Sequence, residues 1–181
     1  MKLWLVRHAQ PLIAPGICYG ATDVPADAVA TQQAARALAL VLPQGLRVIS
    51  SPLLRCEQFA LNLRALRPDL TYETDARLKE MDFGCLEGQR WADIAPSELA
   101  QWTDNFGHWR FGGVESVQDV MARVASLWDD VRSAGDDAAW ITHAGVIRAA
   151  MLLSQGVREV TRADQWPSAH IEFGCATALW V

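Results

Sequence analysis

Two arginines and two histidines stand at the ends of apolar segments, where their side chains could act on an anion. Arg7 and His8 follow the apolar run LWLV, and His143 follows AAWIT. Arg55 lies shortly after the apolar run LRVIS. A guanidinium group matches phosphate oxygens with two parallel hydrogen bonds, and a neutral imidazole can attack a phosphate ester. Together, these residue types indicate a site that binds a phosphate group.

Arg55 and His143 both lie at the start of segments with helical spacing. A cation in the first turns of a helix opposes the helix dipole, at a cost of about 0.3 to 1 kcal/mol when exposed, and a bound anion would reverse the sign. The backbone N–H groups of Ala144 and Gly145 are expected to be free to point at an anion. Each residue alone is more simply a solvated or capping side chain, but their combination favours a phosphate site.

The elements that position these residues alternate between strand and helix patterns. Short apolar runs predict strands at KLWLV, LRVIS, LTYET, AAWIT and ATALWV. Helical spacing predicts helices over about 28–42 and 116–134, and in the segments SSPLLRCEQFALNLRAL, with a serine N-cap, and HAGVIRAAMLLSQG. This alternation predicts a three-layer αβα sandwich, in which helices cover both faces of a mainly parallel central sheet. Ligands of such sheets bind beyond the carboxyl ends of the strands.

Two segments interrupt the alternation. The loop ARLKEMDFGCLEG contains two glycines and fits neither helix nor strand, a pattern typical of functional loops. Residues 89–113 hold Trp91, Trp102 and Trp109 among short apolar patches. They predict small helices that form a cap-like insertion within a single domain of residues 1–181.

The composition is that of an ordinary globular protein. Of the 181 residues, 51% are hydrophobic and 20% are charged. The net charge of −5 comes without a long basic run, which argues against nucleic-acid binding. The four cysteines form no CxxC pair, which argues against a zinc site, and no apolar stretch approaches the roughly 18 residues of a membrane span. We therefore expect a cytoplasmic enzyme without metal, cofactor, membrane or nucleic-acid partner, whose substrate is a small-molecule phosphate ester.

Five motifs in order along the chain resemble the histidine phosphatase superfamily, the phosphoglycerate-mutase-like enzymes. The first is VRHAQP, in which Ala9 takes the place of the glycine of R-H-G. The others are SSPLLRCEQFA, LKEMDFGCLEG, GVESVQDVMARV and ITHAGVIR. They cover nearly the whole chain, and the resemblance implies the phosphoglycerate-mutase-like fold.

The resemblance also implies a role for each residue of the expected site. His8 would form a phosphohistidine, and Arg7, Arg55 and His143 would bind the phosphoryl oxygens. Glu80 would donate a proton to the leaving oxygen. These roles agree with the chemistry expected from the residue types, because neighbouring arginines keep an imidazole neutral and offset charge on a phosphoryl group.

Asp82 is the alternative proton donor, and a hydrogen bond that orders the loop is its simpler explanation. The acid phosphatase branch places an aspartate directly after the second histidine, where this sequence has Ala144. This difference favours Glu80. Tyr19 and the tryptophan-rich segment could stack on an aromatic substrate group. Glu87 is expected to border the phosphate pocket.

Departures from the family pattern narrow the function. An asparagine that often helps to hold phosphate is missing, since the corresponding residues are Gln10, Pro11 and Ala14, and Leu86 replaces a common tryptophan. Mutases of the superfamily are generally longer, with segments that shield the phosphoenzyme from water, so hydrolysis is expected here. The stretches APGICYGATDVP and FGCATAL most resemble α-ribazole phosphatases. This resemblance implies hydrolysis of α-ribazole 5′-phosphate in cobalamin nucleotide-loop assembly.

Two alternatives remain at the level of the sequence. One is a broad-specificity sugar-phosphate phosphatase, or a protein phosphohistidine phosphatase, that uses the same chemistry. The other is a catalytically silent ligand-binding member of the fold. The presence of all five expected active-site residues argues against silence, and the sequence leaves the oligomeric state open.

Overall fold

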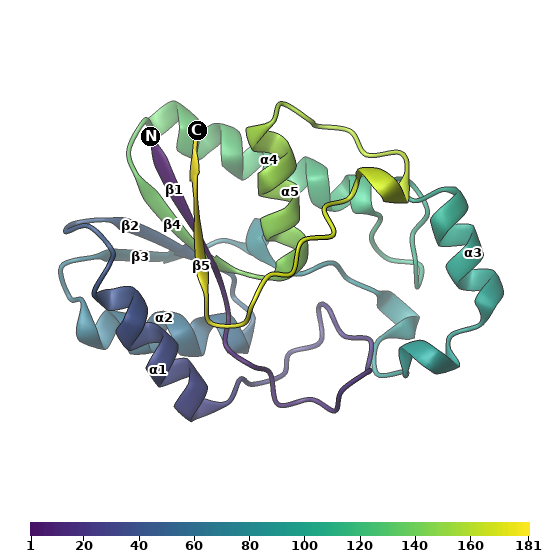
Figure 1. The fold of residues 1–181 in the computed structure, drawn as a ribbon, viewed down its shortest axis with the longest axis horizontal. Coiled ribbons are helices and arrows are strands. Elements are labelled where there is room, and N and C mark those ends of the chain that lie inside the picture. The colour runs from purple at the N-terminus through teal and green to yellow at the C-terminus, as the bar shows by residue number, and fades with distance from the viewer.

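A five-stranded sheet with helices on both faces forms the frame of the protein (Figure 1). The computed structural model describes all residues 1–181. The strands are β1 (Lys2–Arg7), β2 (Arg47–Ser50), β3 (Thr71–Thr74), β4 (Ala138–Thr142) and β5 (Ala176–Trp180). They lie in the order β3-β2-β4-β1-β5, and every neighbouring pair is parallel except β1 with β5. The predicted α/β fold with a mainly parallel sheet is confirmed.

Four of the five helices divide between the two faces of this sheet. The helices are α1 (Ala28–Ala39), α2 (Leu54–Leu66), α3 (Pro96–Asp104), α4 (Val117–Ala134) and α5 (Ala144–Ser154). Successive side chains of a strand point to opposite faces, so β1 supplies both apolar layers. Leu3 and Leu5 pack in the layer shared with α4 and α5, whereas Trp4 and Val6 pack in the layer shared with α1 and α2.

The helix ends follow the expected capping rules at α1 and α4 but not at α2. The Asp27 carboxylate caps α1, and Ser116 caps α4. The predicted serine N-cap of α2 is wrong, because this helix starts at Leu54 without a side-chain cap. The Ser51 hydroxyl instead accepts a hydrogen bond from the Leu53 N–H at 3.3 Å, before the helix begins.

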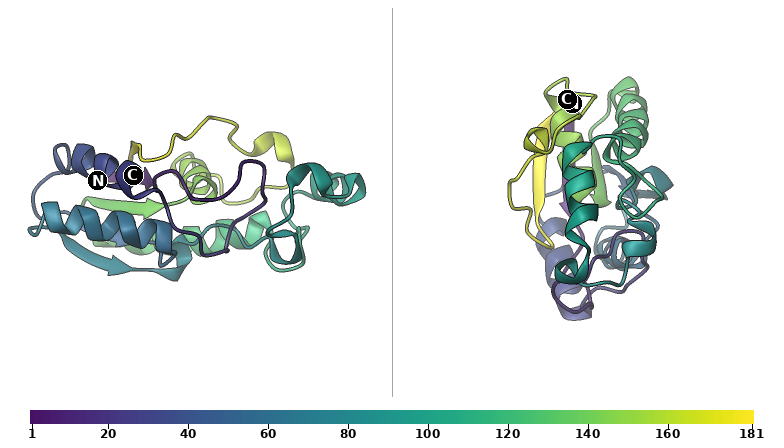
Figure 2. Two further views of the ribbon diagram at one scale, coloured as in Figure 1. Left: turned by 90° about the horizontal axis from the view of Figure 1, so that it is seen from below. Right: turned by 90° about the vertical axis from the view of Figure 1, so that its right-hand side faces the viewer.

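The segments outside the sandwich contain short helical turns. The loop expected to be neither helix nor strand contains two 3-10 turns, η1 (Ala76–Leu78) and η2 (Gly84–Leu86). Residues 89–113 contain η3 (Trp91–Asp93) and α3, which lies at the end of the molecule far from α1 and α2 (Figures 1 and 2). Another turn, η4 (Ala163–Gln165), interrupts the long connection to β5. None of the helices has the length and apolar character needed to cross a membrane.

Candidate active site

The carboxyl ends of β1, β2 and β4 bring the two histidines together. Just beyond β1, the His8 N–H donates to Thr142 O at 3.0 Å, and just beyond β2, the Ser51 N–H donates to Ile141 O at 2.9 Å. His143 follows Thr142 directly, at the start of α5. The imidazole rings of His8 and His143 lie 5.0 Å apart between centroids. The sheet thus places both predicted histidines together at the carboxyl ends of its strands.

His8 is buried and has one nitrogen ready for attack. Its Nδ1 lies 2.7 Å from Ala9 O, and because a carbonyl oxygen only accepts, Nδ1 carries the proton. The other nitrogen, Nε2, then has a lone pair, and it accepts a hydrogen bond from Arg55 Nε at 3.3 Å. Burial, with the Arg55 charge beside it, lowers the pKa of His8 to about 3. The imidazole is therefore neutral at physiological pH, as a nucleophile must be.

His143 is fully buried and has one nitrogen without a partner. Its Nε2 lies 2.9 Å from Ser51 Oγ, and its Nδ1 is buried without a hydrogen bond. Burial, followed by the charge of Arg55, holds the pKa of His143 well below its usual value. If the Ser51 hydroxyl donates to Nε2 of this neutral ring, Nδ1 carries the proton and is a free donor. A phosphoryl oxygen is an acceptor that would satisfy it.

Arg55 is a buried cation that has no carboxylate partner. Its side chain is fully buried, and its guanidinium donates to Gly20 O at 2.6 Å and to Thr22 O at 2.9 Å. Every ion pair of the protein involves other arginines. Because a buried charge is costly unless it is paired, this arrangement favours binding of an anion beside His8.

Arg7 is held by the connection that leads to β5. Its Nη1 donates to Ile171 O at 2.5 Å, and its guanidinium carbon lies 3.6 Å from the centroid of the Phe173 ring. The same ring is 5.5 Å from the His8 ring. Burial lowers the pKa of Arg7, and its buried Nε has no partner. Arg7 therefore offers a second cation without a carboxylate partner, and a free donor, next to His8.

Glu80 reaches the same region from the loop after β3. Its carboxylate accepts hydrogen bonds from the N–H groups of Gly145 and Met81, each at 3.1 Å. The expectation that the Gly145 N–H is open to an anion is therefore wrong, because this donor holds the Glu80 carboxylate. A Cβ atom on Gly145 would lie 3.2 Å from Cδ of Glu80 and still closer to Oε1. A glycine is needed here so that the carboxylate can approach the start of α5, where Ala144 is the first helical residue.

Comparison with known proteins identifies the family. The model of the histidine phosphatase superfamily (branch 1) matches residues 3–171. The chain belongs to the histidine phosphatase superfamily. It is therefore an enzyme of the phosphatase class, for which a small-molecule phosphate ester is the expected type of substrate. No curated protein sequence matched the chain.

Solved structures share the whole fold of this histidine phosphatase. A mycobacterial glucosyl-3-phosphoglycerate phosphatase is 24% identical with a TM-score of 0.82, over 98% of this chain and 88% of that one. A structure described as mycobacterial hydrolase 2 is 23% identical with a TM-score of 0.82, over 98% and 80% of the two chains. The protein TTHB049 from Thermus thermophilus is 31% identical with a TM-score of 0.71, over 99% and 93%.

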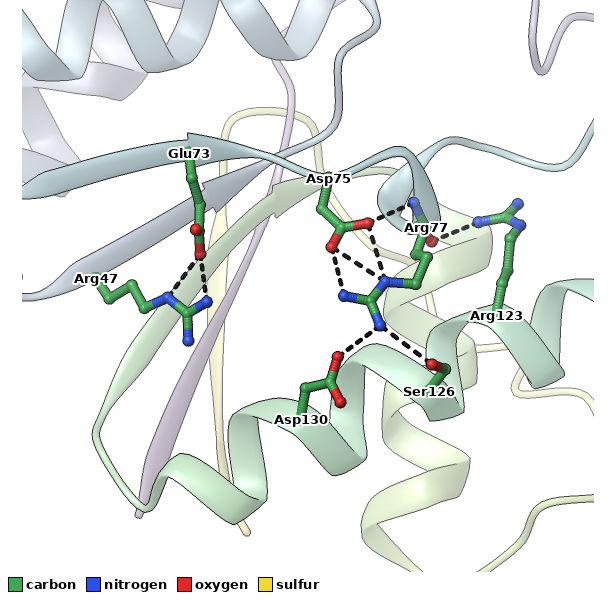
Figure 3. Close-up of polar contacts among 7 residues, drawn as sticks. All are labelled: Arg47, Glu73, Asp75, Arg77, Arg123, Ser126 and Asp130. Atoms are coloured by element: carbon green, nitrogen blue, oxygen red, sulfur yellow. Dashed lines mark hydrogen bonds and ion pairs between the residues drawn. The ribbon is translucent and has the colours of Figure 1, made fainter.

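Polar contacts with α4 fix the loop that carries Glu80 in this histidine phosphatase. The Arg77 guanidinium binds the carboxylates of Asp75 and Asp130 and the hydroxyl of Ser126, while Arg123 Nη1 donates to Arg77 O (Figure 3). In the same view, Arg47 of β2 pairs with Glu73 of β3 at the edge of the sheet. The loop is thereby fastened at Arg77, shortly before Glu80.

The carboxylates of Asp82 and Glu87 are occupied by backbone groups. Asp82 Oδ1 accepts from Gly84 N–H at 2.8 Å. This hydrogen bond orders the loop, as the simpler of the two explanations for Asp82 expects. Glu87 accepts from the N–H groups of Ala21 and Thr22. Burial opposes ionisation of Glu87, but these hydrogen bonds hold its pKa below the usual value. Glu87 thus holds the segment whose carbonyl oxygens bind Arg55.

Tyr19 lies between the two unpaired arginines. Its half-buried ring is 5.5 Å from the guanidinium carbon of Arg55. Burial raises the pKa of Tyr19, and the charges of Arg7 and Arg55 oppose this rise. No group of three or more His, Cys, Asp or Glu side chains is placed to hold a metal ion.

Sequence reasoning missed three parts of the site. The carbonyl oxygens of Gly20 and Thr22 carry no signal in residue type, because every residue has one. Ser51 had a visible motif, SSP, but it was interpreted as a helix cap. Phe173 belongs to FGCATAL, whose resemblance gave no role to the ring, although an aromatic residue near a predicted arginine is a recognisable cation–π candidate.

Proposed function

We propose that this protein hydrolyses phosphate monoesters through a phosphohistidine formed on Nε2 of His8. The observation that carries the proposal is the contact between the buried, carboxylate-free guanidinium of Arg55 and the lone pair of a neutral His8. An anion that binds beside Arg55 and His8 is stabilised by a cation that has no carboxylate partner. It also lies next to a nucleophile. The unpartnered nitrogens of Arg7 and His143 supply further donors for its oxygens.

The reaction follows in two balanced steps. In the first, Nε2 of His8 attacks phosphorus, the P–O ester bond breaks, and Glu80 transfers a proton to the leaving oxygen. In the second, water attacks the phosphohistidine while the Glu80 carboxylate takes up a proton, and the P–N bond breaks. Inorganic phosphate leaves, and His8 and Glu80 return to their initial states. Arg7 and Arg55 offset the charge on the phosphoryl oxygens in both steps, and the neutral His143 ring donates a hydrogen bond to them.

The proposed physiological substrate is α-ribazole 5′-phosphate. Both stretches that resemble α-ribazole phosphatases contribute to the site. APGICYGATDVP contains Tyr19 and also Gly20 and Thr22, whose carbonyl oxygens hold Arg55. FGCATAL contains Phe173, which packs against Arg7. The sequence differences that mark this group therefore lie where a substrate would be recognised.

The mechanism is tested by trapping the phosphoenzyme. With ³²P-labelled substrate and a denaturing quench, the native protein should carry acid-labile label, and His8→Ala should carry none and show no turnover. His108→Ala is the matched control, because His108 is exposed and lies outside the site. Near-native activity of His8→Ala would refute the mechanism.

The substrate is tested separately with a panel of phosphate esters. We expect kcat/KM to be highest for α-ribazole 5′-phosphate among a set that includes fructose phosphates, phosphoglycerates and a phosphohistidine peptide. Comparable values across the panel would favour the broad-specificity alternative. That result would leave the phosphohistidine mechanism intact.

A further inference from the structure

The edge strand β3 and the neighbouring helix α2 form an outer surface away from the candidate active site (Figures 1 and 2). β3 lies at one end of the strand order and pairs with β2 alone. A hollow of about 270 Å³ separates β3 from α2, and both elements line it. We name this region the α2–β3 surface; its residues include Glu57, Ala60, Leu61, Arg64, Tyr72 and Thr74.

The free edge of β3 offers backbone groups for pairing with another strand. The N–H groups of Thr71 and Asp75 donate to carbonyl oxygens at either end of β2. Because alternate N–H groups of a strand point to opposite edges, those of Tyr72 and Thr74 point outward. Residues 71–74 include neither lysine nor proline, the residues that commonly protect an edge strand from pairing. The edge can therefore accept a further strand.

The outer face of α2 has one apolar side chain between two opposite charges. Leu61 is 63% exposed, and the exposed Glu57 and Arg64 lie four residues before it and three residues after it. This spacing places all three side chains on one face of the helix. Glu57 and Arg64 are about two turns apart, too far to pair with each other, and neither belongs to any ion pair of the protein.

This order of charges complements itself when a second copy of the chain is turned by a two-fold axis. An axis between Ala60 and Leu61 would set α2 antiparallel to α2 of the second copy. Glu57 of each copy would then face Arg64 of the other, and Leu61 would pack on the small Ala60. A glutamate in the first turn and an arginine in the last also suit the dipole of a single helix. Antiparallel helices bring these opposite ends together, so the two effects agree.

We propose that the α2–β3 surface is the interface of a homodimer with two-fold symmetry. An axis perpendicular to the sheet reverses both elements, so it pairs β3 with its counterpart in antiparallel orientation while the helix faces meet. An unrelated strand could use the free edge of β3, but it would leave the charge order of α2 without a partner. The inference does not depend on the proposed function, because the contact residues lie on the exposed face of α2 and Arg55 on its buried face.

Sedimentation velocity over a range of protein concentrations tests the dimer. The native protein should be dimeric at about 100 μM and dissociate on dilution. Leu61→Asp places two carboxylates at the centre of the contact and should raise the dissociation constant of the dimer at least about a hundredfold. Val29→Asp is the matched control, because Val29 of α1 is 64% exposed and lies outside the α2–β3 surface. A native protein that stays monomeric at about 100 μM, or a native dissociation constant in Leu61→Asp, would overturn the inference.

Charge reversal tests the two-fold arrangement itself. Glu57→Arg alone, or Arg64→Glu alone, turns both charge pairs into like-charge contacts and should raise the dissociation constant about tenfold. An equal mixture of the two variants should form a heterodimer with near-native affinity, because the arginines of one copy then face the glutamates of the other. A mixture that associates no more tightly than each variant alone would overturn the arrangement. Far-UV circular dichroism and kcat on p-nitrophenyl phosphate check that each variant is folded.

Discussion

Replacement of Gly145 by alanine should separate activity from stability in this enzyme. The added Cβ would lie 3.2 Å from Cδ of Glu80 and closer to Oε1, so the carboxylate must retreat by about 1 Å to restore van der Waals contact. Such a retreat breaks the hydrogen bond from the Gly145 N–H to Glu80. The end of a flexible side chain moves at little cost, and alanine gains about 1 kcal/mol over glycine within a helix.

The magnitude follows from the role proposed for Glu80. A misplacement of about 1 Å can cost on the order of a hundredfold in rate, and general acid catalysis contributes about 10²- to 10⁴-fold. We therefore expect kcat for an alkyl phosphate to fall about a hundredfold in Gly145→Ala, equal to about 2.7 kcal/mol of barrier. The loss for p-nitrophenyl phosphate should be much smaller, because its leaving group departs without protonation. The melting temperature should stay equal to that of the native protein or rise.

The assay measures kcat on both esters for Gly145→Ala, Glu80→Gln and the double variant. Because both substitutions act on one proton transfer, the double variant should be no slower than Glu80→Gln alone. An equal loss on both esters would refute the reasoning, since the damage would then lie at the phosphoryl group and not at the leaving oxygen. Native kcat on the alkyl ester would refute it as well.

Three further predictions concern the electrostatics and supports of the site. Because the folded pKa is about 3 for His8 and well below 6.5 for His143, the unfolded chain binds more protons as the pH falls below about 6.5. The unfolding free energy should then fall by up to about 1.4 kcal/mol per pH unit for each histidine, and urea denaturation of His8→Asn should show about half the slope. Arg123→Met leaves a largely buried glutamate unpaired and should lose about 1 to 3 kcal/mol of stability, together with kcat, by the same denaturation and steady-state assays. Phe173→Leu removes the ring under Arg7 and should raise KM up to about tenfold, as measured by initial rates.

Each of these predictions has an outcome that contradicts it. A native pH slope in His8→Asn would mean that the pKa of this histidine is not lowered in the folded state. Native stability and kcat in Arg123→Met would show that the contacts of Figure 3 do not hold the Glu80 loop. If Phe173→Leu keeps its KM, the ring does not position Arg7.

The sequence predicted the strands, and the place where the two histidines meet, because both depend on local patterns. Apolar runs of β1 and β4 end where Arg7 and His143 stand, and the carboxyl ends of parallel strands meet at one edge of the sheet. Residue type alone then indicated the chemistry. The contact between Arg55 and His8 needed only the further expectation that α2 begins at the same edge.

The parts that could not be predicted depend on contacts between distant segments. The N–H of Gly145 points at Glu80 and not at an anion, because the loop after β3 folds back to the start of α5. Ser51 contacts His143 in place of capping α2, which begins three residues later at Leu54. Neither the contact of Gly145 with Glu80 nor that of Ser51 with His143 can be found by examining one segment. Both depend on the tertiary structure.

The strand β1, which leads into His8, pairs only with strands from the other end of the sequence. Leu5 lies opposite Trp140 of β4 and Thr177 of β5. Contacts between residues so far apart form late, because the entropy of closing the intervening chain must be overcome first. During synthesis, β1 emerges from the ribosome well before β4 and β5. It has no strand to pair with until they have followed. The sheet around β1 is therefore completed only when β4 and β5 have paired with it.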